Sequence, residues 1–197
     1  MAYIKSALEI ALEKSKKIDR LNPQEMAEIK QNKKIDSILA KYYKDQIDSD
    51  ELWNNLKGIS DKYLIKAQNN FLQSLTFQSN VYDIEKRKKG ILAIENLKKT
   101  SKLTEIEDSF HKLSGINQEL ENKKEQLIKD VKEEFERNPE KRMQTFQQGN
   151  QIMLKEIGFE EYLSQDEDFK NNLNYLEKNY QKKFDNLKKE INRIVNS

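Results

Sequence analysis

Cysteine is absent from this chain of 197 residues, which excludes disulfide bonds and thiolate chemistry. The 5 glycines are isolated from one another, so the sequence has no glycine-rich phosphate-binding loop. The single histidine, His111, lies one helical turn after Asp108. A carboxylate-bridged di-metal bundle needs two such pairs, so we expect no metal or other cofactor and no catalytic residue. No apolar run approaches the about 18 residues of a membrane-spanning helix, so we predict no membrane span.

The chain also lacks a large excess of either positive or negative charge. The chain has 36 Lys and Arg against 34 Asp and Glu, and the two signs are mixed at short range. That pattern is typical of solvated helix faces, and a strong nucleic-acid binder usually carries a larger basic excess. The segment from Ile4 to Leu12 is broken by polar residues, unlike the apolar centre of a signal peptide. We therefore expect a cytoplasmic protein.

The stretch from Thr104 to Arg137 is the longest helix that the sequence predicts. Thr104 and Glu107 have the spacing of a capping box, and no proline follows until Pro139. Its apolar residues recur at helical spacing: Ile106, Phe110, Leu113, Leu120, Leu127 and Val131. A helix of this length, roughly 50 Å, needs a partner along one side, because an isolated helix is near energetic balance at best.

Similar signals predict the other helices. Asn22-Pro23 and Asn138-Pro139 each end one helix and begin the next, and Asp48 and Ser164 begin capping boxes. We expect a break at Ser79-Asn80, a glycine inside a helix at Gly58 and a helix end at Gly158. The predicted helices are 7–20, 23–45, 50–78, 82–99, 104–137, 139–156 and 165–195, and we predict no strand.

The fold class is therefore all-α, an elongated bundle of long antiparallel, coiled-coil-like helices. An N-terminal amphipathic helix in 1–22 precedes a single elongated helical domain in 23–197.

The N-terminal stretch Ile4–Glu13, followed by Ile38-Leu39-Ala40-Lys41-Tyr42, resembles an uncharacterised family of bacterial proteins of unknown function. The resemblance covers the first fifth to quarter of the chain. It implies a bacterial, mostly helical protein and carries over no activity, cofactor or site residue.

Two polar residues, Asn117 and Lys124, fall at heptad positions of the long central helix. They mark either a seam meant for a partner or the edge of a wide internal seam in which Ile116, Ile128 and Phe135 face the core. The amphipathic N-terminal helix, with Leu8 and Leu12 on its apolar face, is a second candidate interaction surface. Its acidic residues weaken the alternative of membrane binding.

The densest basic run is the candidate phosphate contact: Lys86, Arg87, Lys88 and Lys89. Nearby acidic residues dilute it, and a solvated helix face is the simpler interpretation.

We expect a non-enzymatic scaffold or adaptor that binds another protein, or a second copy of itself as a homodimer, through helix faces. The alternative is a nucleic-acid-associated protein that uses the basic segment from Lys86 to Lys102, and an enzyme acting through helix-borne carboxylates is a third hypothesis.

Overall fold

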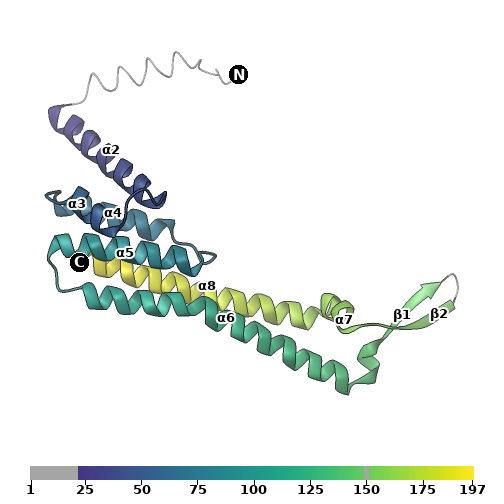
Figure 1. The fold of residues 1–197 in the computed structure, drawn as a ribbon. Coiled ribbons are helices and arrows are strands. Elements are labelled where there is room, and N and C mark those ends of the chain that lie inside the picture. Colours follow the sequence, from purple (N-terminus) through teal and green to yellow (C-terminus); the bar gives the residue numbers. More distant parts are fainter. Residues whose placement is uncertain (1–21, 149–150) are drawn as a thin grey trace, which may run out of the picture. The chain divides into compact units, whose positions relative to one another are not determined.

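The computed structural model describes residues 22–148 and 151–197 (Figure 1). The chain is mostly helical, at 80%, with seven α-helices and a small two-stranded hairpin in the described part. The predicted helix 7–20, which carries Leu8 and Leu12, lies outside the described residues. In the part that is described, no helix is long and apolar enough to cross a membrane.

The chain divides into two compact units, which are described separately. The first comprises 22–74 and 89–103, and the second comprises 75–88, 104–148 and 151–197. Helix α5 (Val81–Lys98) contributes its first part to the second unit and its remainder to the first.

The first unit contains α2 (Pro23–Tyr43), α3 (Ser49–Leu56), α4 (Asp61–Ser74) and the second part of α5. The predicted starts of α2 and α3 are confirmed, because Asn22 and Asp48 each cap a helix in a complete capping box. Two tyrosine rings of α2, Tyr42 and Tyr43, meet the buried Phe71 ring edge-on at 5.4 and 5.2 Å. The apolar side chains of this unit's core are Ile35, Ile38, Leu39, Leu52, Leu56, Leu64, Ala67, Leu72, Ile91 and Ile94.

The prediction of one helix over 50–78 is wrong, because α3 ends at Leu56 and α4 begins at Asp61. Gly58 between them has φ +79°, a conformation in the left-handed region that glycine adopts without steric cost. Gly58 is therefore a turn residue and not a glycine within a helix. The break predicted at Ser79-Asn80 is confirmed, since α5 begins at Val81.

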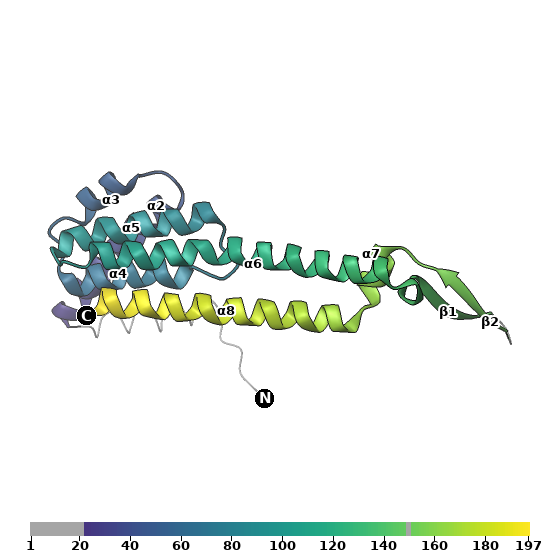
Figure 2. The ribbon, with the colours of Figure 1, turned by 90° about the horizontal axis from the view of Figure 1, so that it is seen from below.

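The second unit is built on α6 (Leu103–Arg137) and α8 (Glu167–Asn196), which lie side by side in both views (Figures 1 and 2). They run antiparallel, because Ser109, Glu119 and Lys124 contact partners progressively earlier in α8: Glu190, Lys183 and Glu177. The long central helix is thus confirmed, although it begins at Leu103 and not after a Thr104 cap.

A coiled coil was predicted, but the structure shows none in the described ranges. The buried positions of α6 include Ser109, Phe110 and Ile116 besides Ile106, Leu113 and Leu120. That stripe is wider than the narrow seam of a coiled coil, as expected for a helix in a bundle.

The helix predicted over 139–156 is wrong. A short 3₁₀ helix (Pro139–Arg142) leads into strands β1 (Met143–Gln148) and β2 (Gln151–Glu156), which pair antiparallel from Met143↔Glu156 to Gln148↔Gln151. The dipeptide between them, Gly149-Asn150, is a two-residue hairpin signal that sequence reasoning missed. The consecutive apolar residues Ile152, Met153 and Leu154 hid the strand alternation.

The last helix begins at Glu167, two residues later than predicted, because its N-cap is Asp166 and not Ser164. An additional short helix, α7 (Phe159–Gln165), comes first, and Gly158 is its N-cap, not the end of a preceding helix. The side chain of Asp166 then caps α8 by accepting hydrogen bonds from the backbone N–H groups of Asp168 and Phe169.

Candidate protein-binding surface

Residues 75–88 cover one part of the α6–α8 pair. The Phe77 ring packs on Phe184 with centroids 5.9 Å apart, and the Lys188 ammonium donates to the Leu75 carbonyl at 2.6 Å. Burial lowers the pKa of Lys188. In this covered part the helices bury Phe110, Leu113, Leu120 and Phe184. Segment 75–88 is thus a third layer that covers the apolar seam between α6 and α8 here.

Farther along the pair the seam is only partly closed. Leu127 and Val131 of α6 are half-buried, as are Leu173 and Leu176 of α8. Of the three residues that the wide-seam interpretation places toward the core, Ile116 and Phe135 are buried but Ile128 is 39% exposed. Two helices alone leave the flanks of an apolar stripe in water, because such a stripe spans more than 100° of the helix surface.

A hollow of about 570 Å³ lies where the covered part gives way to the open part. Segment 77–80 forms one wall, and α6 and α8 form the others. Both candidate residues of the central helix line it, Asn117 and Lys124, and Ile128 lies one turn farther along the same side of α6. We call the hollow and this adjoining stretch, with Ile128, Val131 and Leu173, the open groove.

The two polar seam residues have partners within the chain. The Asn117 amide donates to the Ser79 carbonyl at 3.1 Å, and the Lys124 ammonium pairs with Glu177 at 3.0 Å and Glu121 at 3.3 Å. The hydrogen bond to Glu177 is the main cause of the raised pKa of Lys124. Both side chains are half-buried at the edge of the seam, as the wide-seam interpretation expects.

His111 lines a second hollow, of about 580 Å³, with Lys112, Glu119 and Lys183. The imidazole is exposed, and no group of three or more His, Asp or Glu side chains that could hold a metal ion occurs in 22–148 or 151–197.

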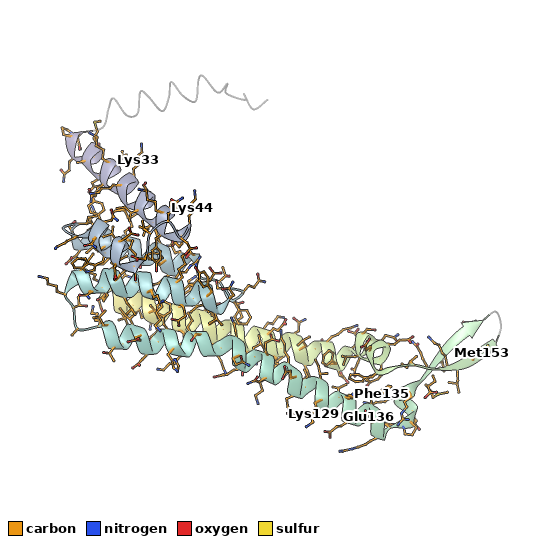
Figure 3. The ribbon with its side chains drawn as sticks, viewed as in Figure 1. Lys33, Lys44, Lys129, Phe135, Glu136 and Met153 are labelled. Atoms are coloured by element: carbon orange, nitrogen blue, oxygen red, sulfur yellow. The ribbon has the colours of Figure 1, made fainter. Side chains whose placement is uncertain are left out.

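A small aromatic cluster lies near the base of the hairpin, at the end of α6 where Figure 3 labels Phe135. The buried Phe135 ring lies 5.6 Å from Phe159 and 5.1 Å from Tyr162 of α7. The Lys141 ammonium, over the Tyr162 ring, pairs with Glu134 at 2.6 Å, and that hydrogen bond raises the pKa of Lys141. Beyond this base the hairpin carries exposed apolar residues, including Met153 (Figure 3).

The basic run of α5 is engaged largely by its own helix. Arg87 pairs with Asp83 at 2.5 Å, Lys88 pairs with Glu85 at 3.3 Å, and Lys86 lies over the Tyr82 ring at 5.7 Å. Lys89 is exposed. Such pairs at helical spacing are typical of a solvated helix face.

A buried polar cluster lies between α4 and α5 in the first unit. The Glu95 carboxylate is fully buried and accepts hydrogen bonds from Gln68 at 2.6 Å, from Lys98 at 3.0 Å and from Thr100. Burial alone raises the pKa of Glu95, but these three donors outweigh it and lower the pKa. Sequence reasoning missed the cluster, because its members are spread over two helices and a loop. No buried side-chain nitrogen or oxygen of the described residues lacks a partner, so the cluster stabilises the fold without an open coordination position.

Comparison with known protein families matches residues 50–193 to a family of unknown function, DUF6657. The chain belongs to this family. Membership in DUF6657 confirms the expected family of unknown function, although the matched residues begin after the N-terminal stretch on which the resemblance was based. No curated protein and no solved structure matches the sequence.

Proposed function

We propose that this protein is a non-enzymatic scaffold or adaptor that binds an amphipathic helix of another protein in the open groove. The observation that carries the proposal is the half-closed seam, in which Leu127, Val131 and Leu173 stay half-buried and Ile128 is 39% exposed. Segment 75–88 acts as a third layer on the neighbouring part of the same helices, so a partner helix would continue that layer. Helix-in-groove binding is a common mode of peptide recognition.

The chemistry of the groove defines the partner. Its apolar floor, Leu120, Val131 and Leu173, suits apolar side chains at i, i+3 and i+4 spacing. Lys124 and Glu177 form an ion pair on the rim of the groove. An acidic side chain of the partner can pair with Lys124, and a basic one can pair with Glu177. The proposal keeps the cytoplasmic location predicted from the sequence, which cell fractionation would test.

The test compares proteins retained from a native lysate by the immobilised full chain and by an Ile128→Glu variant. We expect at least one protein to be retained by the wild type and lost with Ile128→Glu, because a carboxylate at the centre of an apolar contact is costly to desolvate. Ile29→Glu is the matched control, since Ile29 is an isoleucine of α2 in the other unit and is exposed to the same 39%. If every retained protein tolerates Ile128→Glu, the proposal is wrong.

The alternative function, nucleic-acid binding through Lys86 to Lys102, has weaker support. Arg87 and Lys88 are in ion pairs, and the Lys98 side chain is only 5% exposed. A salt-dependent shift of DNA or RNA that is lost on charge reversal at Lys86 and Lys89 would favour it over the adaptor.

A further inference from the structure

We propose that β1 is a pairing edge through which two copies of the chain associate, giving a four-stranded antiparallel sheet in the order β2–β1–β1–β2. In the described ranges the sheet has only the strands β1 and β2. The outer edge of β1 therefore presents backbone N–H and C=O groups that a further strand can pair with.

The composition of β1 favours pairing. Native proteins block open sheet edges with charged residues or proline, and β1, with the sequence MQTFQQ, has neither. The outer edge of β2 differs, because Lys155 and Glu156 place charges there. The charges of β2 lie near the base of the hairpin, whereas β1 has none along its whole length, so β1 is the less protected edge.

Beyond its base, the hairpin needs additional strands or a packed surface to be stable. A two-stranded hairpin is at best marginally stable in water, whereas three or more strands with an apolar face are stable. Its anchors lie at the end nearest the helices: the Ile157 N–H donates to the Arg142 carbonyl at 2.7 Å, and the Gln144 amide donates to Gln165 at 2.7 Å. The Lys155 ammonium also pairs with Glu161 at 3.2 Å.

One face of the hairpin is open and carries three apolar side chains. The register pairs Met143 with Glu156, Thr145 with Leu154, and Gln147 with Ile152, so these six side chains share a face. Its apolar members become more exposed away from the base: Met143 is 44%, Leu154 62% and Ile152 79% exposed. Pairing of two β1 strands about a two-fold axis perpendicular to the sheet places both sets of side chains on the same face of the four-stranded sheet.

A second copy fits this edge better than a strand of different chemistry. The stretch from Met143 to Leu154 has no charged residue, so two copies meet there without like-charge repulsion. Self-pairing of an antiparallel strand is a closed two-fold contact, and the charged β2 edges then stop further addition. The edge lies away from the open groove, so this association is independent of the proposed adaptor function.

Single cysteines test the geometry, because the natural chain has none. Cysteine is introduced separately at Gln144, Thr145 and Gln147 of β1, and at Leu154 of β2. We expect rapid disulfide formation between chains at the β1 position nearest the two-fold axis, where the paired residues face each other. Leu154→Cys should not cross-link, because the two β2 strands are about 14 Å apart, three strand spacings of ~4.8 Å. Cross-linking at Leu154 with none at the β1 positions would overturn the choice of edge.

The mass in solution tests the association itself. Light scattering of the full chain should give twice the 23.4 kDa of one copy, and Thr145→Lys should weaken dimerisation at least about tenfold by placing like charges across the contact. Ser101→Lys, an exposed loop substitution in the other unit, and Ile128→Glu should leave the dimer unchanged. A single-copy mass at all concentrations, open-ended fibres, or a dimer insensitive to Thr145→Lys would each overturn the proposal.

Discussion

A methyl group added at Gly90 of α5 would lie 2.8 Å from the Cζ atom of Phe71. The Phe71 ring is fully buried and is held by the edges of Tyr42 and Tyr43, so it cannot turn aside cheaply. Gly90 thus leaves room for the Phe71 ring of α4 against α5, and it does not interrupt the helix.

Gly90→Ala should therefore destabilise the protein relative to Gly115→Ala. Both glycines lie inside helices, but a Cβ atom at Gly115 meets nothing within 4 Å. Gly115→Ala should raise the free energy of unfolding by about 0.5–1 kcal/mol through helix propensity alone. Overpacking against Phe71 should make the free energy of unfolding of Gly90→Ala about 1–3 kcal/mol lower than that of Gly115→Ala. Urea unfolding of both variants measures the difference, and equal free energies of unfolding would show that the Phe71 ring moves aside to accommodate the added methyl group.

Protonation of Glu95 should lower the free energy of unfolding of the protein at acidic pH. Its folded-state pKa is lowered, so its contribution is present above the ordinary carboxyl pKa and is lost as pH falls through the lowered folded-state pKa. Urea unfolding at a series of pH values below about 5 should show this loss, and Glu95→Gln should reduce the slope. A slope unchanged in Glu95→Gln would assign the acid sensitivity to other carboxylates.

Breaking the Glu95–Lys98 pair on one side should cost more than replacing both partners. Glu95→Leu leaves the Lys98 ammonium, only 5% exposed, without its carboxylate, which should lower the free energy of unfolding by about 3–5 kcal/mol. The double variant Glu95→Leu/Lys98→Leu should recover part of that loss. A double-mutant cycle measures the coupling, and a double variant less stable than Glu95→Leu alone would contradict the expectation.

Phe135 should control the order of the hairpin base. Phe135→Ala removes the ring that contacts Phe159 and Tyr162, at a cost of about 3–5 kcal/mol for a buried ring. Amide hydrogen exchange should become faster in α7 and in β1 and β2, but not in α2 or α4. Ile128→Ala on the same helix is the control and should leave the hairpin amides protected. Unchanged exchange in the hairpin would show that it is anchored by its polar contacts alone.

The Lys124–Glu177 ion pair should contribute little to stability. The Lys124 side chain is 25% exposed and that of Glu177 is 43% exposed, so solvent screens the pair. Lys124→Ala should change the free energy of unfolding by about 0–1 kcal/mol. Asn117→Ala, which removes the bond to the Ser79 carbonyl, should cost about 0.5–1.5 kcal/mol. Chemical denaturation of the two variants gives both values, and a larger loss for Lys124→Ala would reverse this order.

Local signals in the sequence determined where several helices begin. Asn22-Pro23 and Asp48 with Glu51 place caps that depend only on residues three positions apart, so α2 and α3 start where expected. The apolar spacing of the central helix is likewise local, and it predicted α6 to within one residue at its start. Membership in a family of unknown function also followed from the sequence.

Tertiary structure decided what local patterns leave open. Residues 143–156 carry both helical spacing and a Gly-Asn pair in the sequence, but the structure pairs Met143–Gln148 with Gln151–Glu156 as strands and joins Gln144 to Gln165 of α7. Gly58 and Gly90 look alike in sequence, yet one makes a turn with φ +79° and the other admits the Phe71 ring. Asn117 finds its partner in Ser79, which is 38 positions away in the chain. Burial, contact and pairing between distant residues are properties of the folded chain, and no short window of sequence contains them.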